Sequence, residues 1–125
     1  MIAELFVFGT LLDPITRAWV LGHPLRPSET VPALIEGCER VQTRGRHYPV
    51  LIREPGGVVD GLLLTKLSAR ERARLKVYEG PEYQLVRMRV RALRKGEPLV
   101  WTNVFMARGL GATKRPWFPM GHHPR

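Results

Sequence analysis

The chain has 125 residues, of which 44% are hydrophobic and 25% charged, so it is long enough for one domain with a single core but not for two. Basic residues outnumber acidic ones by 20 to 11, giving a net charge of +9. No apolar run reaches the roughly 18 residues that span a bilayer, and the lone Cys38 excludes an internal disulfide. With no signal-peptide pattern at the start, we expect a cytoplasmic protein without a membrane partner.

The first quarter of the chain predicts a strand, a turn and a helix. Residues 2–8 form an apolar run typical of a strand that is buried on both faces. The run ends at Gly9, and Asp13 followed by Pro14 is typical of a helix start. We therefore expect a helix over residues 14–21, ended by Gly22, and a loop over residues 23–30.

The middle of the chain alternates extended segments with turns. Residues 31–42 look extended, and Gly37 within them predicts a bulge or a close approach of two backbones. Two apolar runs, 48–52 and 58–64, flank a Pro-Gly-Gly turn signal and predict a hairpin.

A second helix and a pair of strands are expected in the last third. Ser68 and Glu71 form a capping box that begins a helix over residues 67–80. Residues 83–93 alternate between apolar and arginine side chains and should pair with residues 99–106. The fold class is therefore α+β: a small mixed, mostly antiparallel β-barrel of about five or six strands with two short flanking helices. We assign this domain to residues 1–106 and expect an irregular C-terminal tail over residues 107–125.

Glu79 stands out among the few acidic residues. It lies at the predicted C-terminal end of the second helix, where the helix dipole disfavours a negative charge. A residue placed against its local preference is a candidate for function, although an exposed glutamate is the alternative. Cys38 is expected to be a buried, unreactive thiol, and His122 and His123 lack a third ligand for a metal ion.

Four segments in order resemble the gamma-glutamylcyclotransferase-like (AIG2-like) family. They are "LFVFGTLL" near the start, "YPVLI" in the middle, then "GGVVDGLLLTKL" and "LKVYEGPEYQLVRMRV", and together they cover most of residues 2–106. The resemblance implies a small mixed barrel with flanking helices. It also implies a cofactor-independent reaction in which a γ-glutamyl amine or amino acid is cyclised to 5-oxoproline and the amine is released.

The resemblance also assigns site residues. Glu79 matches the family's catalytic glutamate, whereas Lys76 stands where the family has an aspartate. The family's substrate loop, whose backbone N–H groups hold the γ-glutamyl part, corresponds to Phe8, Gly9, Thr10, Leu11 and Leu12. Tyr48 and Tyr83 are further candidates as pocket walls or hydrogen-bond donors, and no metal is implied. Partial burial should raise the pKa of Glu79 and suit it to acid–base chemistry.

Two other functions stay open at this point. A non-catalytic small-molecule-binding protein could keep this fold, with Lys76 as the sign of lost activity. A basic nucleic-acid-binding barrel would explain the net charge and could use Trp101 and Phe105 for stacking. Aromatic residues on alternating strands more often face the core, so the signal for nucleic acid is weak, and the resemblance implies a small γ-glutamyl compound as the partner. The oligomeric state cannot be read from the sequence.

Overall fold

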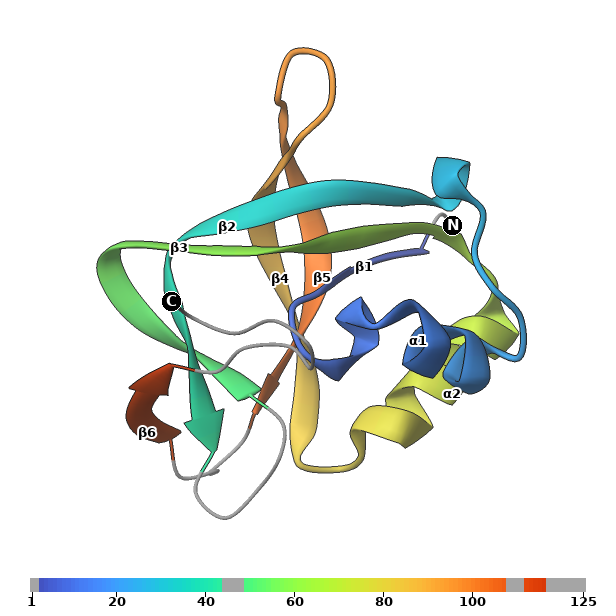
Figure 1. The fold of residues 1–125 in the computed structure, drawn as a ribbon, viewed down its shortest axis with the longest axis horizontal. Helices are drawn as coiled ribbons and strands as arrows, with labels where there is room; N and C mark the ends of the chain where they lie inside the picture. Colours follow the sequence, from blue (N-terminus) through green and yellow to red (C-terminus); the bar gives the residue numbers. More distant parts are fainter. Residues whose placement is uncertain (1–2, 44–48, 108–111, 117–125) are drawn as a thin grey trace.

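A computed structural model of the chain describes residues 3–43, 49–107 and 112–116 (Figure 1). Its helices are α1 (Pro14–Leu21) and α2 (Ala69–Glu79), with 3-10 turns at Thr10–Leu12 and Pro27–Glu29. Its strands are β1 (Ala3–Val7), β2 (Thr30–Thr43), β3 (Pro49–Leu67), β4 (Tyr83–Ala92), β5 (Leu99–Ala107) and β6 (Ala112–Pro116). Within the described residues, no helix is long and apolar enough to cross a membrane.

Five of the strands close into a barrel. The hydrogen-bonded order is β3-β1-β5-β4-β2, and β2 pairs back onto β3, which completes the ring. The β1–β5 pair is parallel and the other pairs around the ring are antiparallel. Because the ring is closed, each of these five strands pairs with a neighbouring strand on both of its edges. The expected fold class, a small mixed barrel with two short helices, is confirmed.

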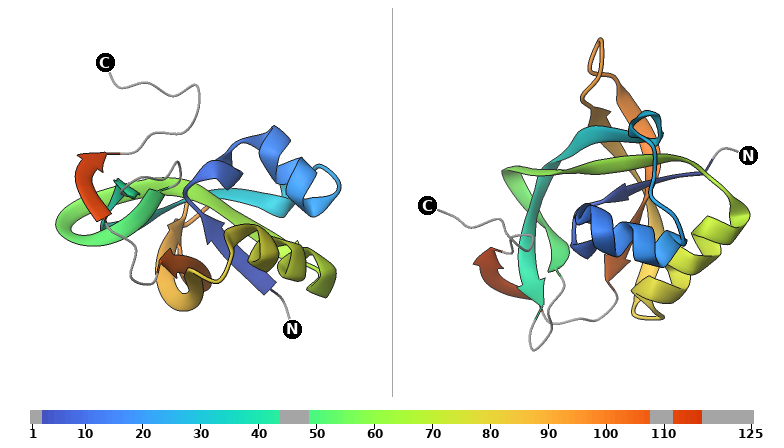
Figure 2. Two further views of the ribbon diagram at one scale, coloured as in Figure 1. Left: turned by 90° about the horizontal axis from the view of Figure 1, so that it is seen from below. Right: turned by 45° about the vertical axis from the view of Figure 1, so that its right-hand side comes forward.

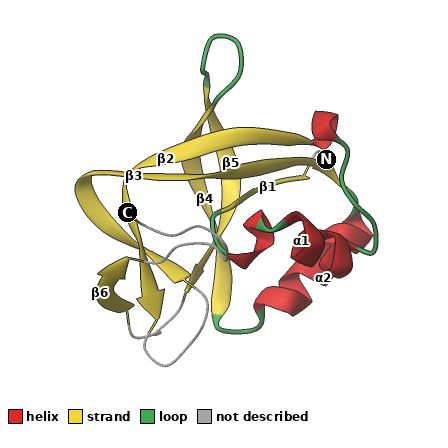
Figure 3. Ribbon diagram, in the orientation of Figure 1, coloured by secondary structure: helices red, strands yellow, loops and turns green. Residues whose placement is uncertain are grey.

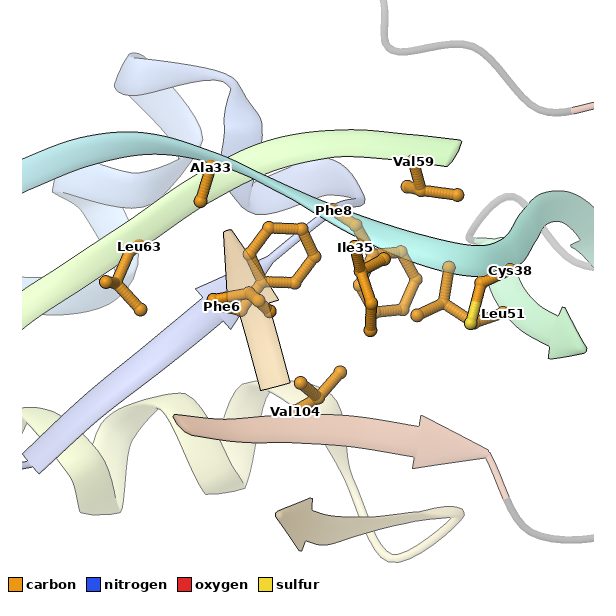
Figure 4. Packing of buried hydrophobic residues seen from close by; sticks show 10 residues of the cluster. Phe6, Phe8, Ala33, Ile35, Cys38, Leu51, Val59, Leu63 and Val104 are labelled. Atoms are coloured by element: carbon orange, nitrogen blue, oxygen red, sulfur yellow. The ribbon is translucent and has the colours of Figure 1, made fainter. Parts of the chain in front are cut away.

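The first strand is buried on both faces, as its unbroken apolar run predicts. It lies between β3 and β5, and Leu5 and Val7 are each 4% exposed. These two side chains pack in a cluster with residues of both helices, whereas Phe6 and Phe8 pack in a second cluster with Ile35 of β2 (Figure 4). Strand β1 is therefore held from both sides, and the turn that follows it starts from a fixed position.

Helix α1 begins and ends where the sequence predicts. The Asp13 carboxylate accepts hydrogen bonds from the backbone N–H and the hydroxyl of Thr16, at 3.0 and 2.7 Å. These bonds hold the pKa of Asp13 below its usual value. Pro14 opens the helix, and Gly22 ends it with a φ of 89°, a conformation that glycine adopts without strain.

Helix α2 begins with the predicted capping box. The Glu71 amide donates to the Ser68 hydroxyl at 3.1 Å, and the Ser68 amide donates to the Glu71 carboxylate at 2.9 Å. Gly80 follows the last residue, Glu79. The two helices lie next to one another on the same side of the barrel (Figures 2 and 3).

We expect Ser68→Ala to lower the free energy of unfolding by about 1 kcal/mol, because it removes the side-chain acceptor from the start of α2. Urea unfolding followed by circular dichroism measures the change. Ser28→Ala is the control, since Ser28 is an exposed serine within the Pro27–Glu29 turn. Equal destabilisation by the two substitutions would contradict a capping role for Ser68.

The expected hairpin over residues 48–64 is wrong. Residues 49–52 of the first run and the whole of the second belong to the single strand β3, and both pair with β2 rather than with each other. The register of the β2–β3 pair shifts from Glu36↔Val58 to Cys38↔Arg53. Residues 54–57, which contain the Pro-Gly-Gly segment, therefore form a bulge opposite Gly37. Gly37 has a φ of 80°, which confirms the expected bulge. Figure 1 shows β2 and β3 bending together in this region.

Part of the C-terminal tail is ordered as a strand rather than irregular. Ala112–Pro116 forms β6, which pairs antiparallel with the end of β2 through Val41↔Pro116 and Thr43↔Ala112. This strand lies outside the five-stranded ring. The other residues beyond 107 fall outside the described part of the chain.

Candidate active site

The turn after β1 presents backbone amides. Its own hydrogen bonds run from the Leu12 amide to the Gly9 carbonyl at 3.0 Å and from the Asp13 amide to the Thr10 carbonyl at 3.2 Å. A 3-10 turn leaves its first amides without a partner inside the turn, here those of Thr10 and Leu11. A Cβ on Gly9 would lie 3.1 Å from the Pro49 ring, so a glycine suits this close approach.

A pocket of about 360 Å³, open solvent at its mouth included, joins this turn to the end of α2. It is lined by Phe6, Val7, Phe8, Gly9, Thr10, Leu11, Pro49, Glu79, Tyr83 and Phe105. The fold thus brings Glu79 to the turn at residues 9–11 across about 70 positions of sequence. The resemblance assigns Glu79 and this turn to one site, and the structure places them in one pocket.

Burial raises the pKa of Glu79 from 4.5 to about 7. Removing a carboxylate from water disfavours its charged form, and the aromatic and aliphatic lining offers no compensating charge. In the described part of the chain, no basic side chain lines the pocket. At neutral pH the group therefore exists in both protonation states and can accept or donate a proton. The expected direction of the shift is confirmed.

Two tyrosine hydroxyls form hydrogen bonds between the elements around the pocket. The Tyr78 and Thr10 hydroxyls are 2.8 Å apart, so the last turn of α2 is linked directly to the turn after β1. The Tyr83 hydroxyl donates to the Pro49 carbonyl at 3.4 Å. Tyr83 is placed in the pocket wall, as expected. The sequence places Tyr78 beside Glu79 but does not predict its contact with Thr10, and it gives no sign of Pro49 as a pocket residue.

The other predicted site residues are less directly placed. Leu12 does not line the pocket; its carbonyl and that of Leu11 accept hydrogen bonds from Arg17, at 3.5 and 3.1 Å. Tyr48 falls outside the described residues. Lys76 is exposed in the last turn of α2, where the helix dipole favours a positive charge. The lysine therefore suits the helix end that carries Glu79.

Cys38 is a free, buried thiol, which confirms its expected burial, and desolvation raises its pKa, which disfavours the reactive thiolate. Among the described residues, no group of three or more histidine, cysteine, aspartate or glutamate side chains could hold a metal ion. His122 and His123 lie beyond that part of the chain.

The two aromatic residues of β5 differ in their environments. Phe105 is 7% exposed and packs with residues of both helices, whereas Trp101 is 58% exposed. The Arg89 guanidinium lies 5.5 Å from the Trp101 ring. The expectation that such aromatics face the core is therefore wrong for Trp101. Both side chains lie on the same face of β5, being four residues apart, but the helices cover only the end that carries Phe105.

These features define a class of protein: a small closed barrel with a largely desolvated, partly buried carboxylate next to a turn of backbone amides. The sequence model of the family described as "Gamma-glutamyl cyclotransferase, AIG2-like" matches residues 5–122. The chain belongs to this family.

Individual relatives agree with this assignment. Protein AIG2 C of Arabidopsis thaliana is 34% identical over 105 residues, which cover 80% of this chain and 62% of that protein. The solution structure of an Arabidopsis thaliana protein aligns with a TM-score of 0.72 at 27% identity, covering 86% of this chain and 62% of the chain in that structure. The chain thus spans slightly less than two thirds of the length of either.

A more distant likeness extends the same fold. A structure titled gamma-glutamyl cyclotransferase aligns with a TM-score of 0.64 at 10% identity, covering 90% of this chain and 70% of the other. At this identity the similarity shows the shared barrel fold.

Proposed function

We propose that this chain is a γ-glutamyl cyclotransferase, which cyclises a γ-glutamyl amine or amino acid to 5-oxoproline and releases the amine. The observation that carries the proposal is Glu79, a carboxylate with a pKa raised to about 7 in a pocket that it shares with the turn at residues 9–11. Membership of the AIG2-like cyclotransferase family supports the same reaction.

The γ-glutamyl part of the substrate binds in the pocket. Its α-carboxylate lies against the amides of Gly9 to Leu11, which form a concave group of donors suited to an anion. The apolar walls, including Phe6 and Phe105, exclude water from the reacting atoms. The substrate's leaving amine is directed toward the open mouth of the pocket.

Glu79 carries protons between the two nitrogens of the substrate. The ionised carboxylate takes a proton from the α-ammonium, and the freed amine attacks the γ-carbonyl carbon to form the ring C–N bond. The original amide C–N bond then breaks. In total the α-nitrogen gives up two protons and the leaving nitrogen gains two, so one carboxylate that accepts and donates in turn closes the balance. No redox step or external nucleophile is required.

Two effects supply the rate. Holding the α-amine against the γ-carbonyl in the ring-closing geometry lowers the barrier by several kcal/mol, on the order of 7–11 in well-oriented intramolecular reactions. Proton transfer by a positioned group typically adds about 10²–10⁴-fold.

The direct test is the formation of 5-oxoproline by the purified chain. Each member of a panel of γ-glutamyl amines and γ-glutamyl amino acids is incubated with it, and both 5-oxoproline and the free amine are measured. Equal amounts of the two products support the proposal. A γ-glutamyl compound that binds without turnover would identify a non-catalytic binding protein, the alternative that Lys76 raises.

We expect kcat/KM to rise about tenfold from pH 6 to pH 8 and then level off, because Glu79 with a pKa of about 7 must be ionised to act as a base. The sign follows from the carboxylate: protonation below pH 7 removes the acceptor. Initial rates at substrate concentrations well below KM give the profile. A profile that is flat between pH 6 and pH 8 would contradict this role.

A further inference from the structure

The Arg40 side chain contacts the start of the turn after β1 without lining the pocket. It lies on β2 beyond the bulge at Gly37, and its side chain is only 10% exposed. Its Nη1 donates to the carbonyl of Phe8 at 2.8 Å and to the carbonyl of Asp60 at 3.1 Å. Its Nη2 lies 3.0 Å from the Asp60 carboxylate, which is on β3 and largely exposed. The guanidinium therefore binds Asp60 and donates a hydrogen bond to the Phe8 carbonyl at the same time.

The Phe8 carbonyl matters because it shares a peptide group with the Gly9 N–H. The described peptides are all trans, so this C=O and this N–H point in opposite directions. A donor that fixes the carbonyl fixes the direction of the amide. Gly9 lacks a side chain that would restrict its backbone, so the orientation depends on such an outside contact.

The contact also acts electrostatically. A hydrogen bond from a charged donor is stronger than one between neutral groups, and it polarises the peptide to which it is made. The positive charge of Arg40 is thus transmitted through the Phe8–Gly9 peptide to the pocket, although Arg40 is not among its lining residues. This arrangement suits a pocket whose ligand is an anion and whose Glu79 must not be paired with a cation.

We propose that Arg40 is a positioning residue that orients the Phe8–Gly9 peptide so that the Gly9 N–H is presented to a carboxylate in the pocket. The identity of the ligand rests on the proposed function, whereas the orientation of the peptide does not. The bend of β2 and β3 at Gly37 is what carries Arg40 back to the end of β1, 32 residues away.

The test compares Arg40→Met and Arg40→Lys with Arg91→Met. Arg91 is a matched control, because it also pairs with a carboxylate, Glu36 at 3.1 Å, and donates to a carbonyl, Glu97 at 3.1 Å, without lining the pocket. Three quantities are measured: the ¹H–¹⁵N resonance of the Gly9 amide without ligand, the dissociation constant of 5-oxoproline, and KM and kcat separately.

Arg40→Met should shift the Gly9 resonance and weaken 5-oxoproline binding by about 10- to 100-fold, the effect of losing one charge-assisted hydrogen bond. KM should rise by a similar factor, while kcat and its pH profile stay within about threefold because Glu79 is untouched. Arg40→Lys should lie between, since an ammonium cannot reproduce the fork of a guanidinium. Arg91→Met should leave all three quantities unchanged.

An unshifted Gly9 resonance with unchanged 5-oxoproline binding in Arg40→Met would overturn the inference, and so would equal losses in the Arg40 and Arg91 variants. If Arg40→Met does not fold, an unshifted Gly9 resonance in Arg40→Lys overturns it. If the unaltered protein neither binds 5-oxoproline nor forms it, the proposed function fails, and the Gly9 resonance alone then decides whether Arg40 orients the peptide.

Discussion

Glu79→Gln is expected to reduce turnover by at least about 10²-fold while the protein folds normally and still binds a γ-glutamyl ligand. Glutamine keeps the size and polarity of the side chain but cannot exchange a proton with the α-ammonium. The loss should therefore fall on kcat, with KM little changed. Amine release from the best substrate of the panel measures the effect.

Glu82→Gln is the matched control for this substitution. Glu82 lies three residues further on, past Pro81, and it does not line the pocket, so the variant should keep most of its activity. Equal losses in the two variants would indicate a general effect of charge and would remove Glu79 as the proton carrier.

The same substitution is expected to stabilise the protein at alkaline pH. A carboxyl whose pKa is raised from 4.5 to about 7 by burial binds its proton more tightly in the folded state than in the unfolded state. Stability from this group is therefore fully present below pH 4.5 and is lost as the pH rises to about 7. At 1.36 kcal/mol per pH unit the loss is about 3 kcal/mol, which Glu79→Gln avoids.

Urea unfolding near pH 5 and near pH 8 measures this difference. The Glu79→Gln variant should be close to the unaltered protein at the lower pH and more stable by about 3 kcal/mol at the higher one, and Glu82→Gln should show no such gain. A gain of the same size at both pH values would mean that packing, rather than ionisation, distinguishes the variant. If the gain appears only at the higher pH, the Glu79 carboxylate supports activity at the expense of stability, as is common where a charge is buried for function.

Local signals in the sequence were sufficient for most elements. Asp13 with Pro14, and Ser68 with Glu71, place the helix starts because capping depends only on residues within one turn. The apolar run at residues 2–8 predicts a fully buried strand. The Pro-Gly-Gly signal misled, because a turn motif does not reveal that a third strand, here β2, pairs with both flanking segments.

Some residues of the candidate site can likewise be predicted from local sequence, and others cannot. Glu79 and the turn at residues 9–12 could be recognised because each is a short motif carried by consecutive residues. The exposure of Trp101 could not be predicted, since it depends on how far the helices extend over β5. Tyr78 meets Thr10 only because α2 packs beside the end of β1.

What the sequence determined by itself is therefore the two helices, most of the strands and the two short motifs that meet in the pocket, because these follow from contacts between neighbours along the chain. Only the tertiary structure decided the burial that raises the pKa of Glu79 and the contact of Arg40 with Phe8. Both depend on closing the ring of strands and bending β2 and β3 at Gly37, which brings together residues separated by tens of positions. No local sequence pattern predicts such long-range contacts.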